Sequence, residues 1–262
     1  MKGDVVALGR TAEVLDWGDG RVLKLFYAWC PLAWADREAR AARVIDGLGL
    51  PAPALLDEVA VEGRRCLVYE RVDGPNLLDA LFADLSQAPT LIGQLGALHA
   101  EVHQRHAPGL DAIRDALRWS IERAETTPAI RDAALARLAG LPDGDCLLHF
   151  DFHPQQVLVT ARGPIILDWM TAARGHPLAD VARTTMLFRV SAKPGGSAAE
   201  MAVIDAQRAT LLRRYLAAYL AARPDLDREA LDQWLLPVAV ARLEEGIAGE
   251  RGPLLSVIEE QL

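Results

Sequence analysis

The sequence is poor in cysteine and in positive charge, and it has no long apolar run. Its 262 residues include three cysteines, Cys30, Cys66 and Cys146, which form neither an even disulfide framework nor a zinc motif. We therefore expect a reducing, cytoplasmic location. No run approaches the roughly 20 apolar residues that span a bilayer, so no membrane partner is expected. The 28 Lys and Arg against 36 Asp and Glu leave a net charge of −8, which argues against a nucleic-acid partner.

The overall composition is that of an ordinary globular protein. Hydrophobic residues make up 51% and charged residues 24% of the chain, which is close to average usage. The length fits one large domain or two small lobes with a buried core. The acidic balance is compatible with a cationic small-molecule partner, and it leaves the oligomeric state open.

The first 72 residues are predicted to form strands around one helix. The Asp19-Gly20 and Glu62-Gly63 dipeptides are typical of hairpin turns. Pro31 suits the first turn of a helix that runs to about Asp46 and ends at the following glycines. The predicted strands are residues 11–15, 21–27, 54–61 and 64–70.

Beyond the Asp73-Gly74-Pro75-Asn76 break, the chain becomes mainly helical. Apolar residues at helical spacing predict helices over residues 89–106, 111–125, 128–138, 178–190, 198–222, 227–245 and 253–261. Short strands are predicted at 146–149, 157–159 and 165–167, and a loop at 193–197. The sequence therefore indicates an α+β protein, with a small β-rich part followed by a larger helical one.

Two carboxylates flank the hairpin predicted at residues 157–167. Asp151 and Asp168 lie at its two ends, and a hairpin of this length returns the chain close to where it began, so we expect both at the same end. Phosphoryl transfer needs one carboxylate to orient and deprotonate the attacking hydroxyl and another to hold Mg²⁺. The alternative is that both are turn residues that cap strand ends.

Three segments around these carboxylates carry a family resemblance. His149–Gln156 reads HFDFHPQQ, Leu167–Trp169 reads LDW, and Gly175–Asp180 reads GHPLAD. Their order and spacing resemble the aminoglycoside phosphotransferase and choline kinase-like family, whose motifs run His-Gly-Asp-x-His-Pro-x-Asn, Ile-Asp-Trp and Gly-x-Pro-x-x-Asp. Residues 49–53 and 67–74 are also similar to the family. The C-terminal helices resemble it only in kind.

The resemblance implies a bilobal protein-kinase-like fold. Residues 1–72 would form the N-terminal nucleotide-binding lobe, a small antiparallel sheet with one helix, and residues 73–76 the hinge. Residues 77–262 would form the larger helical lobe, with a catalytic loop at 149–156 and a metal-binding segment at 167–169. No activation segment is recognisable between Trp169 and Pro177, so a protein kinase is a less favoured reading.

The resemblance also assigns roles around the two carboxylates. Asp151 would be the catalytic base and Asp168 the principal metal ligand, with Gln156 at the second ligand position. The family has asparagine where this chain has Gln156, whose amide oxygen is displaced by one methylene, roughly 1.5 Å. The family also has glycine where this chain has Phe150. Neither departure removes a carboxylate.

The nucleotide would be held by the first lobe. By resemblance, Lys24 would contact the ATP phosphates and pair with Glu38, while the backbone of Glu70 and Val72 would bind adenine. Without the resemblance, Lys24 would extend its ammonium to solvent, guard a sheet edge or meet an opposite charge, of which edge guarding is favoured, and Glu38 would belong to a solvated face. Glu70 and Val72 would be a strand end and a linker.

The remaining polar motifs are expected to be structural. His99 and His103 lie one helical turn apart and indicate helix packing rather than a zinc site. Asp180 would cap a helix or hold the catalytic-loop backbone. In the family, acidic and aromatic residues of the last helices line the acceptor site, and the last helices here carry Trp234, Arg242, Glu244 and Glu245. For Glu244 and Glu245 a solvated face is the favoured interpretation.

Together these features predict an ATP- and Mg²⁺-dependent kinase that phosphorylates a hydroxyl of a small molecule. GTP is the alternative nucleotide. The acceptor is not identified, since relatives serve aminoglycosides, choline-like amines, sugars, amino-acid alcohols and nucleosides. A second hypothesis, motivated by Phe150 and Gln156, is a catalytically weak, pseudokinase-like regulator that binds nucleotide.

Overall fold

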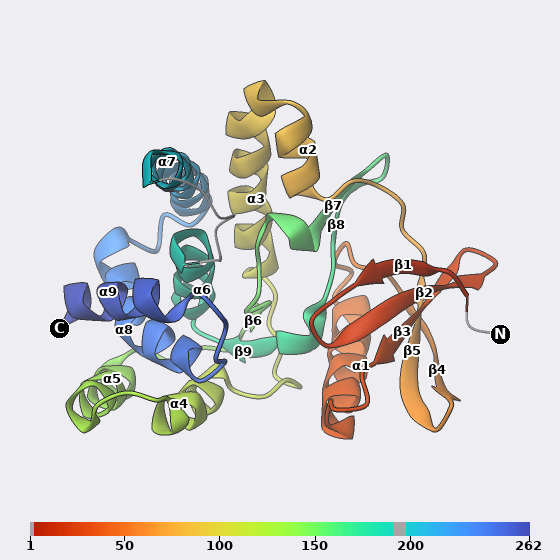
Figure 1. Ribbon diagram of the computed structural model, residues 1–262, viewed down its shortest axis with the longest axis horizontal. Coiled ribbons are helices and arrows are strands. Elements are labelled where there is room, and N and C mark those ends of the chain that lie inside the picture. The colour runs from red at the N-terminus through yellow and green to blue at the C-terminus, as the bar shows by residue number, and fades with distance from the viewer. Residues whose placement is uncertain (1–2, 191–197) are drawn as a thin grey trace. The chain divides into compact units, whose positions relative to one another are not determined.

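The computed structural model describes residues 3–190 and 198–262, which form two compact units (Figure 1). The first unit contains the chain up to Ala80 together with Gln155–Ala172. The second unit contains Leu81–Pro154 and Ala173–Leu262. The hairpin between the two motif aspartates thus belongs with the N-terminal residues. The lobe bounds expected from sequence stay a prediction, and the loop expected at 193–197 lies outside the described residues.

The first unit is built on one antiparallel sheet. Its strands run in the order β1-β2-β3-β5-β4, with bounds β1 (Val5–Leu8), β2 (Ala12–Gly18), β3 (Arg21–Phe26), β4 (Leu55–Val61) and β5 (Arg64–Glu70). Glu62 and Gly63 both have positive φ, 53° and 74°, as a two-residue hairpin turn requires. Strand β1 was not predicted. It lies at the sheet edge with every residue exposed, so no burial pattern marks it.

Helix α1 (Leu32–Gly47) packs on one face of this sheet. Its Ala35 and Ala39 are fully or almost fully buried against Phe26 and Leu67. These small residues allow the helix to approach closely. Residues opposite each other in the antiparallel register share a face, and Lys24 pairs with Leu67. The register therefore directs Lys24 toward the face that α1 covers.

A two-stranded hairpin completes the first unit. Strands β7 (Val157–Thr160) and β8 (Gly163–Ile166) pair from Val157 opposite Ile166 to Thr160 opposite Gly163. The 3₁₀ turn η3 (Trp169–Thr171) follows and packs against α1. The Ile166 amide donates to the Pro51 carbonyl at 2.7 Å, which ties the hairpin to the segment after α1.

The second unit is mainly helical. Its elements are η1 (Leu85–Gln87), α3 (Ala88–Val102), α4 (Ile113–Arg123), α5 (Pro128–Gly140), α6 (Pro177–Val190), α7 (Ala198–Ala222), α8 (Arg228–Leu243), α9 (Arg251–Gln261) and the strand pair β6 (Cys146–Leu148) and β9 (Ala173–Gly175). Helix α2 (Leu77–Ala83) and the 3₁₀ turn η2 (Pro154–Gln156) span the boundaries between the units. Almost every residue of α6 is buried, as expected for a helix enclosed by others. Among the helices described, none combines the length and apolarity needed to cross a bilayer.

Helices α3 and α7 approach closely at Gly96. A Cβ added there would lie 2.5 Å from the Tyr215 carbonyl oxygen and 3.0 Å from the Ala218 Cβ. Gly93, one turn earlier on the same helix, has nothing within 4 Å of such a Cβ. The contact brings Tyr215 against the helix that carries His99, which matters for the site described below.

We expect Gly96→Ala to lower the free energy of unfolding by about 1–3 kcal/mol, because the two backbones must move apart. Gly93→Ala is the matched control and should raise it by up to about 1 kcal/mol through helix propensity. Urea denaturation measures both. Equal stabilities for the two variants would contradict the close contact of α3 with α7.

Candidate active site

One lysine in the first unit binds two carboxylates at once. Lys24 Nζ donates to both carboxylate oxygens of Glu38, each at 2.8 Å, and to Asp168 Oδ1 at 2.9 Å. The side chain of Glu38 is 3% exposed, whereas that of Asp168 is 37% exposed. Strand β3, helix α1 and the segment after β8 thus bring together three residues that lie far apart in the sequence.

The charges of this cluster support one another. Burial by itself would lower the pKa of Lys24, but the facing carboxylates of Asp168 and Glu38 outweigh it and hold this pKa above its usual value. Lys24 is therefore protonated at neutral pH. Burial raises the pKa of Glu38, and the Lys24 ammonium opposes that rise.

Tyr69 is a member of the cluster that sequence reasoning missed. Its hydroxyl donates to Glu38 Oε1 at 3.1 Å, and burial together with the Glu38 carboxylate raises the pKa of Tyr69 well above its usual value. Tyr69 follows Leu67 by two residues on β5 and therefore shares its face. The alternation of side chains along β5, which puts Tyr69 on the same face as Lys24, was the available signal.

The β7–β8 hairpin brings together the two chain segments that carry the expected metal ligands. The Leu167 amide donates to the Gln156 carbonyl at 2.8 Å, so Gln156 lies next to the residue that precedes Asp168. Asp168 has a positive φ of 55°, which is uncommon for a residue other than glycine. A carboxylate and an amide oxygen form a donor set that suits Mg²⁺, so these residues fit the expected metal.

The expected adenine-binding residues lie at the end of β5. The Glu70 amide donates to the Ala54 carbonyl at 2.9 Å, and its carboxylate binds Arg162, in the β7–β8 turn, at 2.8 Å. Val72 follows two residues later and is partly buried. The structure thus gives Glu70 a structural bond through its amide and its side chain, while the role of both residues toward a nucleotide stays a prediction.

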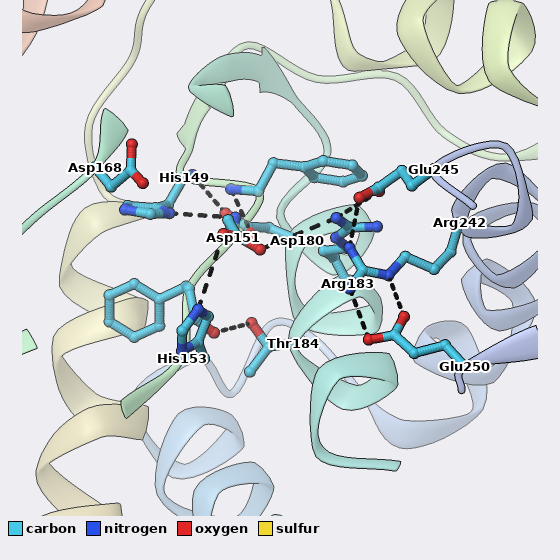
Figure 2. A network of polar contacts seen from close by, with 12 residues as sticks. His149, Asp151, His153, Asp168, Asp180, Arg183, Thr184, Arg242, Glu245 and Glu250 are labelled. Carbon is cyan, nitrogen blue, oxygen red and sulfur yellow. Dashed lines mark hydrogen bonds and ion pairs between the residues drawn. The ribbon is translucent and has the colours of Figure 1, made fainter. Parts of the chain in front are cut away.

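In the second unit, Asp180 holds the backbone of the expected catalytic loop (Figure 2). Its Oδ2 accepts the His149 amide at 2.6 Å and its Oδ1 accepts the Phe150 amide at 3.0 Å. Asp180 is fully buried. Burial by itself would raise the pKa of Asp180, but His99 and His103 hold it well below its usual value. The carboxylate is therefore ionised, as an acceptor for two amides should be.

Two buried histidines support Asp180 from α3. His99 Nε2 lies 3.1 Å and His103 Nε2 3.3 Å from Asp180 Oδ2. The Nδ1 atoms lie 2.6 Å from the Tyr215 hydroxyl and 2.7 Å from the Tyr219 hydroxyl, respectively. The three side chains are close enough to surround a cation, yet their polar atoms already order the loop and the α3–α7 packing. The structural reading predicted for His99, His103 and Asp180 agrees with this arrangement.

Phe150 occupies a backbone conformation that favours glycine. Its φ is 62°, in the left-handed region where a Cβ atom costs roughly 1–2 kcal/mol. The family motif has glycine at this position, so the structure supplies the physical reason for that preference. The ring of Phe150 lies 5.5 Å from the Arg183 guanidinium carbon, a cation–π distance. The strained backbone of Phe150 thus coincides with a contact between its ring and Arg183.

Asp151 lies in the same loop, in the second unit, and its side chain is 28% exposed. Its amide donates to His149 Nδ1 at 3.2 Å. Its carboxylate oxygens lie 3.8 Å from His153 Nε2 and 4.0 Å from Arg183 Nη2. Asp168 belongs to the first unit, so the expectation that the two aspartates meet at one end of the hairpin stays a prediction.

Glu245, for which a solvated face was the favoured interpretation, is placed differently. It binds Arg183 and Arg242, each at 2.6 Å, and these arginines lower the pKa of Glu245 although burial opposes them. Trp234 is buried and stacks on His176. Glu245 is thus a partly exposed member of an ion-pair network with two buried arginines, which no local pattern in the sequence indicated.

The buried His103 makes the stability of the chain depend on pH. Burial, assisted by His99, lowers its pKa from 6.5 to about 4. The unfolded chain therefore binds more protons than the folded one between these values, and the free energy of unfolding falls as the pH falls through this window. We expect the burial of this residue to lower the free energy of unfolding by on the order of 2 kcal/mol between pH 7 and pH 5. Urea denaturation at both pH values should show a smaller loss in His103→Gln than in the native chain, and an equal loss would contradict the assignment.

The strain at Phe150 can be isolated with two substitutions. Phe150→Gly and Phe150→Ala both remove the ring, but only alanine keeps a Cβ in the left-handed conformation. We expect the glycine variant to be more stable than the alanine variant by about 1 kcal/mol, measured by urea denaturation. The opposite order would show that residue 150 is not held at positive φ.

Comparisons with known proteins identify the fold and the family of the chain. A curated relative, acyl-CoA dehydrogenase family member 11 of Rattus norvegicus, is 26% identical over 182 residues, which is 58% of this chain but 23% of that protein. The chain therefore spans only a minor part of the curated relatives that it matches. Among solved structures, choline kinase from Cryptosporidium parvum matches with a TM-score of 0.63 and 10% identity, covering 98% of this chain and 87% of the other. The streptomycin–ATP–APH(2")-IIa ternary complex matches with a TM-score of 0.61 and 14% identity, covering 98% and 92%.

These structural neighbours establish the fold, which is the protein-kinase-like fold of the aminoglycoside phosphotransferases and choline kinases. The sequence pattern of the phosphotransferase enzyme family matches residues 7–234, a span that contains Lys24, Glu38, Asp151, Asp168 and Asp180. Because this match covers most of the chain, the chain belongs to the phosphotransferase enzyme family.

Proposed function

We propose that the protein is an ATP- and Mg²⁺-dependent kinase that phosphorylates a hydroxyl group of a small molecule. The observation that carries this proposal is the bond of Lys24 to both Glu38 and Asp168, because it fixes an obligate cation beside a partly exposed carboxylate. Among the neighbours, one is a choline kinase and another was solved with streptomycin and ATP. Their acceptors are small molecules, which supports the proposed substrate class.

Each residue has a defined part in this proposal. Lys24, oriented by Glu38, contacts the phosphates of the nucleotide, and the backbone of Glu70 and Val72 binds the adenine. Asp168 and Gln156 hold Mg²⁺, which when bound supplies positive charge that offsets the charge of the transferred phosphoryl group. The chain contributes mostly by positioning and by electrostatic stabilisation.

In this proposal Asp151, in the second unit, is the catalytic base. Its carboxylate orients the acceptor hydroxyl and takes its proton, which leaves the oxygen as the nucleophile. The Asp180-held backbone of residues 149 and 150 fixes the loop that carries it. The acceptor itself is open. Glu245, the acidic residue that would favour a cationic acceptor, already binds two arginines. A cytoplasmic location and ATP rather than GTP are further parts of the proposal.

A second candidate function is a nucleotide-binding regulator with weak catalysis. The positive φ of Phe150 favours it, because the family's glycine would occupy that conformation without strain, and Gln156 in the asparagine position points the same way. This candidate and the kinase share nucleotide binding and differ in turnover, so one experiment separates them.

We expect saturating ATP with Mg²⁺ to raise the unfolding temperature of the native chain by roughly 5–10 °C, since ligand at 100 times its Kd adds about 2.7 kcal/mol. Asp168→Asn should lose the part of this shift that depends on Mg²⁺. Asp151→Asn should keep the shift while phosphoryl transfer to an acceptor, or to water, falls by roughly 10²–10⁴-fold. The measurements are thermal unfolding and ADP release.

Asp115→Asn serves as the control, because Asp115 pairs with Arg118 on an exposed face of α4, and it should match the native chain in both assays. A nucleotide shift without ADP release in the native chain would favour the regulator. No shift with ATP or GTP at millimolar concentration would overturn both candidates. Native turnover in Asp151→Asn would show that another group is the base.

A further inference from the structure

A chain of alternating charges runs from the start of α9 to the expected catalytic loop (Figure 2). Arg242 Nε binds Glu250 at 2.8 Å, and Arg242 Nη1 binds Glu245 at 2.6 Å. Glu245 binds Arg183 Nη2 at 2.6 Å, and the same nitrogen lies 4.0 Å from Asp151 Oδ1. All five residues belong to the second unit. The last member of the chain is the carboxylate proposed as the base.

The network is too buried to be an incidental surface pairing. The side chains of Arg183 and Arg242 are each 6% exposed and that of Glu250 is 4% exposed. Removing such charges from water costs free energy that their attraction offsets only in part, so a buried ion pair is weak evidence for stabilisation. A role in fixing the position of a functional group accounts better for the burial of these charges.

Helix α6 grips the catalytic loop with one face. Asp180, Arg183 and Thr184 are spaced i, i+3 and i+4, which places their side chains on the same side of the helix. Asp180 accepts two loop amides, and Thr184 Oγ1 donates to the Phe152 carbonyl at 2.9 Å. Between them, Arg183 faces the Asp151 carboxylate and lies over the Phe150 ring. Asp180 and Thr184 thus bind the loop backbone, whereas Arg183 contacts loop side chains.

Two basic side chains lie near the Asp151 carboxylate, and of these Arg183 is the one that is always charged. The other carboxylate oxygen of Asp151 faces His153 of its own loop, at 3.8 Å, and that ring is charged only when protonated. Arg183 comes from α6 and keeps its charge at every pH of interest. Glu245, from the segment after α8, lies behind Arg183 and fixes its guanidinium by a short ion pair.

We propose that Arg183 is a positioning residue for Asp151: anchored by Glu245, its guanidinium orients the Asp151 carboxylate. The proposal rests on the proposed role of Asp151 as the base. The ring of Phe150 adds a second support for the guanidinium, which gives the unusual residue at the family's glycine position a function. The segment between α8 and α9 thereby acts on the catalytic loop through one ion pair.

The test follows the carboxylate of Asp151 itself. The carboxyl carbon of Asp151, in protein labelled with ¹³C-aspartate, is observed by NMR at neutral pH and assigned by its absence in Asp151→Asn. Arg183→Met keeps the apolar stem and removes the charge, and we expect the Asp151 signal to change its chemical shift and to broaden, because the carboxylate loses the group that orients it. Arg183→Lys should restore most of the native chemical shift. Glu245→Gln removes the anchor and should broaden the signal, because the guanidinium is then free to move.

Arg189→Met is the matched control. Arg189 lies on the same helix but pairs with Glu260, so its loss should leave the Asp151 signal unchanged. An unchanged Asp151 signal in folded Arg183→Met would overturn the proposal. A signal that changes equally in Arg183→Met and Arg189→Met would also overturn it, because a general effect of charge would then be at work.

A second measurement uses turnover and separates this proposal from the proposed function. In ATP hydrolysis with water as acceptor, Arg183→Met should lower kcat by roughly 10-fold and leave KM for ATP unchanged, and Arg183→Lys should restore most of kcat. A fall in kcat together with a rise in KM, and no rescue by lysine, would show a merely structural role. If the native chain hydrolyses no ATP, the proposed function fails, while the NMR signal of Asp151 still decides whether Arg183 positions it.

Discussion

One buried carboxylate, that of Asp180, organises the helical unit. An ionised group enclosed by protein must have partners for its oxygen atoms, and here the partners are two amides of the catalytic loop and two histidines of α3. The histidines in turn contact two tyrosines of α7. The close approach of α7 at Gly96 is what brings Tyr215 within reach. A single charge therefore links a loop and three helices.

The first unit has a comparable arrangement around a positive charge. Lys24 is a buried cation, and two carboxylates from α1 and from the segment after β8 surround it. Tyr69 then satisfies Glu38. In both units, a polar group that would be costly to bury alone is fixed by partners from distant parts of the chain. Rigid placement of charge is what a phosphotransferase requires, because its catalysis depends on positioning more than on covalent chemistry.

Much of this architecture could be predicted from sequence, and the reasons are local. The Asp-Gly and Glu-Gly turns, the alternation of β3 and the compact motifs around Asp151 and Asp168 act through neighbouring residues. Arg183 and Tyr69 were missed for the opposite reason. Arg183 lies on a helix that is buried on all sides, so helical periodicity does not single it out, and its partner Glu245 lies about sixty residues further on. The side chain of Phe150 gives no sign of its positive φ, because a bulky residue disfavours that conformation; the glycine that the family has at this position was the available signal.

The division of the first unit between two stretches of sequence has a consequence for its synthesis. The sheet and α1 are complete once Ala80 has been made, but the hairpin and the turn that pack with them, including Asp168, belong to Gln155–Ala172. Domains generally fold as units while the chain emerges from the ribosome. Here the N-terminal sheet must wait for more than seventy further residues, with the Lys24–Glu38 pair lacking its third member. A fragment ending near Ala80 would accordingly be an incomplete folding unit.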